Sequence, residues 1–238
     1  MKKSFLLVQV ISLAILMALN TGCSENKGGS ADKPYGEKSG IVTYKPIEMM
    51  GVKMTQTIYF DDYGTKEMRE MTVEGDMMGT AMKQHTVDIR DGNFTYHYEI
   101  ENIAGGKDRA TKNVIKSAFT PEMADNMNLA NLSAEKKAKI KFKEDGTETI
   151  AGLKGIKFTM APDSTNPQNI ITGVHYKNIP LKFSAVPMEM IVEKIELGAS
   201  IPADKFKIPA GYTVVEEPAG QAPQMPTEVP PAAEEPRK

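Results

Sequence analysis

The sequence contains no tryptophan and only one cysteine, Cys23, among 238 residues. A single cysteine cannot form an intrachain disulfide, so the fold must depend on packing alone, even in an oxidising compartment. Histidine is also scarce, with His85, His97 and His175 the only three. Because a zinc site needs several convergent nitrogen and sulfur ligands, the sequence predicts no metal site and no cofactor.

Motifs typical of catalysis and nucleic-acid binding are missing as well. No Gly-x-Ser-x-Gly elbow occurs, and Gly105-Gly106-Lys107 lacks the rest of a phosphate-binding loop. The acidic pair Asp61-Asp62 fits a solvated turn, with weak calcium binding as the alternative. No basic stretch lies beside aromatic residues, which argues against nucleic acid as a partner. We therefore expect no catalytic residues and a protein that is not an enzyme.

The first 22 residues have the composition of a secretory signal peptide. Lys2 and Lys3 precede an uncharged run from Ser4 to Leu19, which is shorter than the roughly 20 apolar residues of a membrane span. Gly22-Cys23 resembles a bacterial lipobox, although Asn20 stands where that motif usually has leucine. A buried, inert thiol is the alternative role for Cys23, but its place between an apolar run and a polar stretch favours lipidation.

Lipidation of Cys23 would hold the protein on a membrane, since two or more acyl chains anchor a protein stably. Ser24 follows the cysteine instead of aspartate, which suggests the outer membrane. We thus expect a monomer in the bacterial cell envelope, facing the periplasm. Without residues 1–22 the chain has 27 basic and 31 acidic residues and a formal charge of −4.

Composition divides the remaining chain into three parts. Residues 23–38 are polar and contain glycine, as in a flexible tether. Residues 39–216 are long enough for one domain with its own core. Residues 217–238 contain six prolines, so this tail buries too little apolar surface to fold and is expected to be a disordered spacer or, alternatively, a partner-binding segment.

Alternation of apolar and polar residues predicts a mainly β domain with about ten strands. Val52, Met54, Ile58 and Phe60 share one face, and segment 66–74 is predicted to return as the second strand of a hairpin. Asp91-Gly92 predicts a two-residue turn that pairs Ile89 with Phe94 and places His85 and His97 on opposite faces. Asp145-Gly146 predicts another turn, and segment 188–197 a last long strand.

One helix is predicted over residues 120–138. Thr120-Pro121-Glu122 suits an N-cap, a first-turn proline and a first-turn acid. Met123, Met127 and Ala130 recur at helical spacing. Few other segments show this period, so the sheet is expected to dominate the domain.

Several short motifs resemble an uncharacterised lipoprotein family within the LolA-like superfamily. They are Gly40-Ile41-Val42-Thr43-Tyr44, segment 57–64, Ile150-Ala151-Gly152, segment 179–183 and the closing run 201–212, of which Phe206-x-Ile208-Pro209-x-Gly211-Tyr212 is the most specific. The resemblance spans residues 36–217. It implies a strongly curved antiparallel sheet, a half-open barrel with a short helical plug, whose concave face holds acyl chains or other apolar ligands.

This resemblance predicts a non-enzymatic binding module for a lipid, an acyl chain or another hydrophobic ligand. The anchor departs from the soluble carriers of the superfamily, so a resident binding protein fits better than a free shuttle. The alternative is a structural or protein-interaction lipoprotein with a filled core and no small ligand. The candidate cavity residues are Ile58, Phe60, Val87, Ile89, Phe94, Tyr96, Tyr98, Ile179, Leu181 and Phe183.

Methionine is unusually frequent, with 16 residues, eight of them between Met49 and Met82. Three interpretations remain open. Methionine can replace leucine in a sheet core, line an adaptable apolar pocket, or supply thioether ligands to Cu(I).

Overall fold

The computed structural model describes residues 33–77, 79–120, 123, 129, 132–161 and 170–216. The predicted signal peptide, Cys23 and the proline-rich tail lie outside these residues. Within the described part, no helix has the length and apolar character needed to cross a bilayer.

The described residues form one large sheet of fourteen strands, more than the ten predicted. The long half contains β1 Gly40–Tyr44, β2 Ile47–Met49, β3 Val52–Asp61, β4 Lys66–Met77, β5 Thr80–Asp91, β6 Phe94–Ala104, β7 Lys107–Asp108 and β8 Asn113–Ala118. The second half contains β9 Lys143–Ile150, β10 Leu153–Met160, β11 Ile171–Tyr176, β12 Ile179–Ala185 and β13 Met188–Leu197. The last strand, β14, is Thr213–Glu216.

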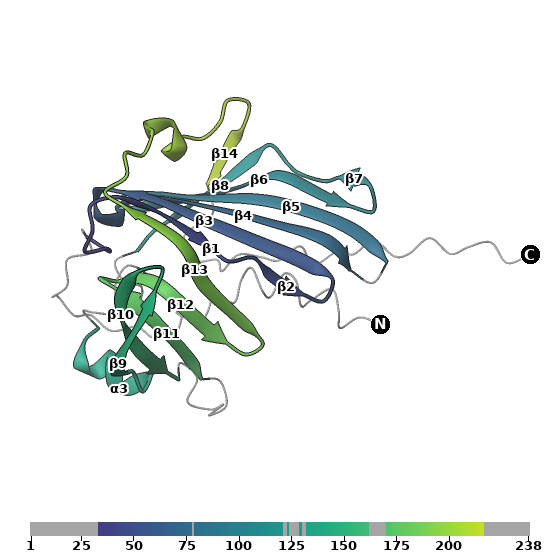
Figure 1. Ribbon diagram of the computed structural model, residues 1–238. Helices are drawn as coiled ribbons and strands as arrows, with labels where there is room; N and C mark the ends of the chain where they lie inside the picture. The colour runs from purple at the N-terminus through teal and green to yellow at the C-terminus, as the bar shows by residue number, and fades with distance from the viewer. Residues whose placement is uncertain are drawn as a thin grey trace, which may run out of the picture.

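The sheet is strongly curved and does not close. Its main order is β14-β8-β6-β5-β4-β3-β1-β13-β12-β11-β10-β9, so β14 and β9 form its two edges. Strands β9 to β12 form an arm that curls under the long strands β3 to β6 (Figure 1). This mainly β, half-open barrel confirms the predicted fold class, with one exception to the antiparallel pairing: β14 pairs with β8 in parallel.

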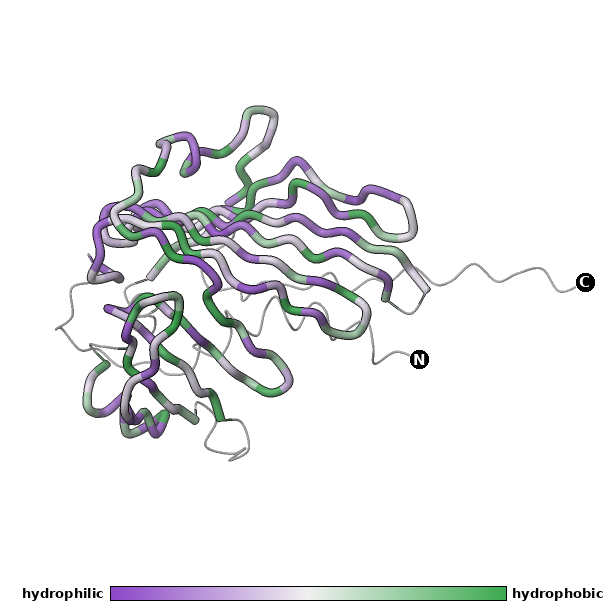
Figure 2. Tube along the Cα trace, viewed as in Figure 1, coloured by the Kyte–Doolittle hydropathy of each residue, from purple (hydrophilic) through white to green (hydrophobic). Residues whose placement is uncertain are grey.

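Alternating side chains give the sheet two distinct faces, visible as alternating colours along the long strands (Figure 2). The inner face, turned toward the arm, carries Val42, Ile58 and Phe60, which contact Ile179 and Leu181 of the arm. The outer face carries the cluster of Met68, Val87, Ile89, Tyr98 and Val114. Each face therefore carries apolar side chains where another part of the chain packs against it.

The predicted hairpin of residues 52–74 is confirmed by β3 and β4, joined through the 3-10 helix η1, Asp62–Gly64. The next hairpin is shifted by one residue from the prediction. Asp91 pairs with Phe94 and Ile89 with Tyr96, so the turn is Gly92-Asn93. The predicted assignment of residues to faces is still correct. Ile89 and its neighbours in β5 each pair with a residue of β6 two positions later than predicted, and side chains alternate between faces with a period of two.

The turn predicted at Asp145-Gly146 is wrong, because β9 continues through it. Thr147 pairs with Ile156 and Glu144 with Phe158, so two residues of β9 oppose one of β10 in a β-bulge. Gly146 has a φ of 73°, a left-handed value that occurs both in glycine-containing bulges and in hairpin turns. The chain reverses instead at Ala151-Gly152, where both φ angles are positive, as in a type I′ turn.

The predicted helix over residues 120–138 is not continuous. The helix α3 spans only Ala134–Lys139, and its N-cap Ser133 has an extended backbone. The Ser133 side chain accepts a hydrogen bond from the amide of Lys136 at 3.1 Å, which starts the helix there. Thr120 does accept the predicted capping bond from the Met123 amide, at 3.3 Å, whereas Met127 and Ala130 lie outside the described residues.

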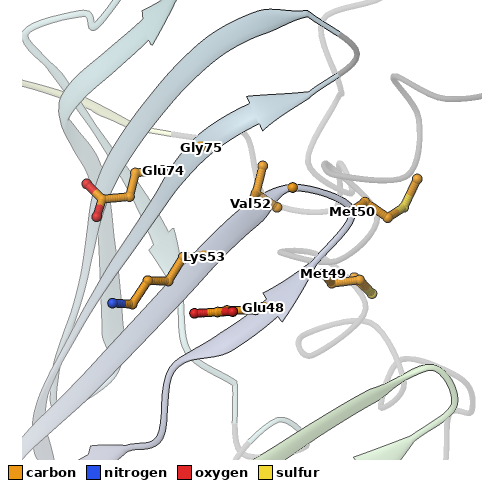
Figure 3. Close-up of a pocket in the computed structure, with 8 residues that line it drawn as sticks. Glu48, Met49, Met50, Val52, Lys53, Glu74 and Gly75 are labelled. Atoms are coloured by element: carbon orange, nitrogen blue, oxygen red, sulfur yellow. The ribbon is translucent and has the colours of Figure 1, made fainter.

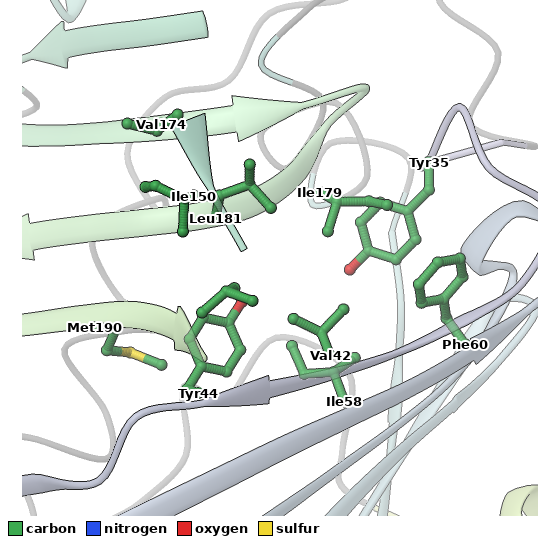
Figure 4. Close-up of a cluster of buried hydrophobic side chains, with 11 residues drawn as sticks. Tyr35, Val42, Tyr44, Ile58, Phe60, Ile150, Val174, Ile179, Leu181 and Met190 are labelled. Carbon is green, nitrogen blue, oxygen red and sulfur yellow. The ribbon is translucent and has the colours of Figure 1, made fainter. Parts of the chain in front are cut away.

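Residues 33–38, predicted as part of the tether, pack onto the fold. Tyr35 is buried and its ring contacts Phe60 edge to face at 4.8 Å. It points between Phe60 and Ile179, into the core that joins the two halves (Figure 4). The packed fold therefore begins before the predicted boundary at residue 39.

Candidate functional site

The ten predicted cavity residues are divided between the two faces of the sheet. Ile58, Phe60, Ile179 and Leu181 are buried together on the inner face. Phe183 packs at the edge of a neighbouring cluster built on Phe142, Phe158 and Met160. The other five, Val87, Ile89, Phe94, Tyr96 and Tyr98, belong to the outer face. They do not surround one cavity.

The outer face is covered by the closing run of the chain, which includes the 3-10 helix η3, Ala203–Phe206. Phe206, Ile208 and Tyr212 pack against the outer cluster. The Tyr212 ring lies 5.1 Å from the Tyr98 ring, and its hydroxyl donates a hydrogen bond to the Glu99 carbonyl at 2.9 Å. Burial of Tyr98, with the neighbouring Tyr212 and Glu70, raises its pKa to about 12.

A group of charged residues lies on the inner face, where β4 begins and β5 ends. Strand register places Glu67 opposite Phe60 and Arg90, and Arg69 opposite Ile58 and Asp88. Glu67 accepts hydrogen bonds from the Tyr35 hydroxyl at 2.5 Å and from Arg69 and Arg90 at 3.1 Å. We call Tyr35, Glu67, Arg69 and Arg90 the inner charged cluster.

Burial and pairing shift the pKa values within this cluster. Burial alone would raise the pKa of Glu67, but the charges of Arg90 and Arg69 and the hydrogen bonds that it accepts lower it below the ordinary 4.5. Burial, reinforced by Glu67, raises the pKa of the Tyr35 hydroxyl. Burial opposes the charge of Arg69, yet Glu67, Tyr35 and Asp88 hold its pKa above the ordinary value. The cluster thus carries two cations and one anion at neutral pH.

Further along the same strands the inner face becomes apolar and rich in methionine. Buried Met54, Val52, Val73 and Met188 form a cluster with partly buried Ile47, Met71, Met77 and Met82. We call these eight residues the methionine patch. It continues directly from the charged cluster, because Met71 follows Arg69 by two residues on the inner side of β4.

An open hollow of about 680 Å³ lies at the end of the methionine patch, at the β2–β3 turn. It is lined by Met49, Met50, Val52, Gly75 and three charged side chains of the neighbouring strands (Figure 3). Val52 belongs to both the hollow and the methionine patch.

The three histidines lie apart, each beside a carboxylate. His85 lies 2.8 Å from Glu70, His97 2.8 Å from Asp88, and His175 3.1 Å from Glu144. Asp88 raises the pKa of His97 through their hydrogen bond. His85 shares the face of Val87 and His97 that of Asp88, as predicted. Among the described residues, no group of three His, Cys, Asp or Glu side chains is arranged to hold a metal.

The inner charged cluster was not among the sequence candidates. Its signal was available in the strand register: if Ile58 and Phe60 face inward, their partners Arg69 and Glu67 must do the same. The segment Lys66-Glu67-Met68-Arg69-Glu70 hides this signal, because charged residues occupy both faces of the strand.

Comparisons with known proteins assign no family. No family model and no curated protein matches the chain. Among solved structures, it is similar to a chain of the Pseudomonas aeruginosa MucA/MucB complex, with a TM-score of 0.45 and 14% identity over 78% of this chain and 60% of that one. It is also similar to PNGF-II, with a TM-score of 0.41 and 13% identity over 76% of this chain and 32% of that one.

A third similar structure is a beta-barrel-like protein of the domain of unknown function DUF1849 from Brucella abortus. Its TM-score is 0.40, with 10% identity over 69% of this chain and 100% of that chain. The chain spans less than two thirds of the first two structures. Membership of the LolA-like superfamily remains a prediction.

Proposed function

We propose that the protein is a lipid-anchored envelope lipoprotein of the outer membrane that binds an apolar or amphiphilic ligand on the inner face of its curved sheet. The observation that carries this proposal is the methionine patch. Met71, Met77 and Met82 are only partly buried although they lie on the covered side of the sheet. Thioether side chains adapt to irregular apolar ligands, and an open hollow lies at the end of the patch.

Binding without catalysis fits the side chains that face inward. On the inner face of β4 and β5, charged groups are paired: Glu67 with Arg69 and Arg90, and Asp88 with His97. A nucleophile held by a base is the arrangement that covalent catalysis requires, and the inner charged cluster contains an arginine-neutralised carboxylate instead. We extend the proposal to a LolA-like monomer that needs no cofactor.

A second candidate is a structural or interaction lipoprotein with a filled core. The observation in its favour is the direct packing of the two halves through Val42, Ile58, Ile179 and Leu181, all nearly inaccessible to solvent (Figure 4). This packing occupies the space beneath β1 and β3. It leaves the methionine patch, which lies toward the opposite ends of β3 and β4, as the region where the two candidates differ.

Native mass spectrometry of the protein, extracted gently from membranes, separates the two candidates. The binding module is expected to carry one lipid-sized ligand in addition to the acyl groups on Cys23, and to lose it under collisional activation before the chain unfolds. A mass equal to that of the acylated chain alone, in several independent preparations, would support the filled-core protein. The anchor is tested separately with Cys23→Ser, which is expected to leave the membrane fraction and to lose the acyl mass.

A further inference from the structure

Two buried polar atoms on the inner face have no hydrogen-bond partner within the described part of the chain. They are Nε of Arg69 and Oγ1 of Thr86. Thr86 is only 4% exposed. Buried polar groups in proteins are nearly always hydrogen-bonded, and a buried hydroxyl without a partner opposes folding. Two such atoms on one face point to a polar group that the described residues do not supply.

The two atoms belong to neighbouring positions of the sheet. Arg69 pairs with Asp88 across β4 and β5, and Met71 pairs with Thr86. Arg69 and Thr86 are therefore diagonal neighbours on the same face, and diagonal Cβ atoms are roughly 7–8 Å apart, within reach of a long side chain. Arg69 uses one terminal nitrogen to bind Glu67, so its Nε–H group remains as a donor.

Apolar surface begins immediately beside this polar pair. Met71 lies between Gln56 and Thr86 in the sheet, and the rest of the methionine patch follows toward the β2–β3 hollow. The surroundings hold charges of both signs, because Arg69 and Arg90 face buried Glu67, while Asp88 and Glu99 lie opposite Arg69 and Thr86 on the same face. The Nε–H group of the Arg69 guanidinium is itself a charged donor, which favours an anionic oxygen as its acceptor.

We propose that the inner face binds a single-chain amphiphile with an anionic oxygen head group. A carboxylate or phosphate oxygen accepts hydrogen bonds from Nε of Arg69 and Oγ1 of Thr86, and the hydrocarbon chain lies along the methionine patch toward the hollow. This inference rests on the proposed function and adds the position and chemistry of the head group. A long-chain fatty acid and a lysophospholipid share this chemistry, and the experiment distinguishes them.

The test measures binding to the full acylated protein after removal of co-purified lipid, by displacement of a fluorescent fatty acid. Oleate, oleyl alcohol and an oleoyl lysophosphatidic acid serve as competitors with the same chain. Oleate or the lysophosphatidic acid is expected to bind at least tenfold more tightly than the alcohol, since hydrogen bonds to charged groups are the stronger ones. The tighter of the two anions identifies the source of the head group.

Thr86→Val tests the head-group position without disturbing the packing, because valine has nearly the same shape and removes a buried hydroxyl that has no partner. It is expected to weaken anion binding about tenfold and to leave binding of oleyl alcohol unchanged. Thr72→Val is the matched control, since Thr72 lies on the same hairpin but pairs with His85 on the outer face. Its affinities are expected to equal those of the wild type.

The outcomes distinguish failure of the head-group site from failure of the proposed function. Equal affinities for oleate, lysophosphatidic acid and the alcohol, unchanged by Thr86→Val, would overturn the head-group site and leave apolar binding intact. No displacement by any of the three compounds would overturn both proposals. Met77→Gln with Met82→Gln is expected to weaken binding of the anions and of the alcohol by the same factor. Weaker binding of the anions alone would show that the hydrocarbon chain of the ligand does not lie along the methionine patch.

Discussion

At the scale of single residues, Glu67 determines how the inner face tolerates charge. It is the one carboxylate between two arginines, and its side chain is only 7% exposed. Removing one partner of a buried ion pair typically costs about 3–5 kcal/mol, because the other charge is left unpaired. Glu67 therefore makes the two arginines compatible with burial.

Glu67→Gln is expected to lower the free energy of unfolding by about 3 kcal/mol at pH 7, because glutamine leaves Arg69 and Arg90 uncompensated. The pKa of Glu67 is lower in the folded state than its ordinary value of 4.5. Its contribution is therefore complete above the unfolded-state pKa and is lost as the pH falls through the folded-state pKa. Urea unfolding from pH 7 to pH 3 should show the wild type approaching the variant as the pH falls.

The surface carboxylate Glu196 provides the control for this pH dependence. It pairs with Lys194 at an exposed site, where ion pairs contribute little to stability. Glu196→Gln is expected to change the free energy of unfolding by less than about 0.5 kcal/mol. A constant difference between wild type and Glu67→Gln at every pH would show that the variant acts through packing, not through charge.

Sequence reasoning predicted apolar residues better than the charged ones that accompany them. Ile58 and Phe60 are buried inward, as their alternation indicates. Arg69, opposite Ile58, could not be placed because β4 carries charged residues on both faces. The grouping of Ile58 with Ile89 failed for a related reason. Alternation assigns residues to faces only within one strand, and the register is needed to relate the faces of neighbouring strands. The register places Ile58, Arg69 and Asp88 on the inner face and Ile89 on the outer face.

At the scale of secondary-structure elements, the two Asp-Gly pairs of the sequence each predicted a glycine with positive φ. They did not show whether that glycine lies in a turn or in a β-bulge. Gly92 lies in a turn one residue later than predicted, whereas Gly146 forms a bulge inside β9. Both structures require the same backbone region. Only cross-strand pairing distinguishes them, and pairing is not encoded in a dipeptide.

The true β9–β10 turn at Ala151-Gly152 carries a residue that suits it poorly. Ala151 has a φ of 47° and is exposed, a conformation that costs a non-glycine residue roughly 1–2 kcal/mol. Asparagine tolerates this conformation and is preferred before glycine in type I′ turns. Ala151→Asn is therefore expected to raise the free energy of unfolding by about 0.5–1 kcal/mol in urea unfolding.

Gly152→Ala at the next position is the opposing variant. Its φ is 81°, and an added Cβ would meet no neighbouring atom, so any loss of stability comes from the backbone alone. A loss of about 1 kcal/mol is expected. If Ala151→Asn and Gly152→Ala had the same sign, the type I′ assignment would be wrong.

At the scale of the whole molecule, two separate links join the long strands to the arm. One is the continuous sheet through β1 and β13. The other is residues 33–38, which contact both halves. The amide of Tyr35 donates to the Tyr63 carbonyl at 2.8 Å, and the amide of Gly36 donates to the Lys177 carbonyl at 2.9 Å. In a protein anchored through Cys23, this segment is where the tether would enter the fold.

Tyr35→Ala is expected to weaken this second link and to let the arm open separately from the long strands. It removes the ring from the core shared with Phe60 and Ile179 and the hydroxyl from Glu67. A loss of about 3–5 kcal/mol in the free energy of unfolding is expected, as for other large buried aromatics. Hydrogen exchange measured by mass spectrometry should show faster exchange in β11 and β12, with β5 and β6 little changed at low denaturant.

Tyr35→Phe separates the contribution of the ring from that of the hydroxyl. It keeps the packing against Phe60 and removes only the hydrogen bond to the charged Glu67, so a loss of about 1.5–3 kcal/mol is expected, with exchange in the arm close to that of the wild type. Uniformly faster exchange in both halves of Tyr35→Ala would mean that the sheet connection through β13 couples them fully. Residues 33–38 would then add stability without forming a separate link between the long strands and the arm.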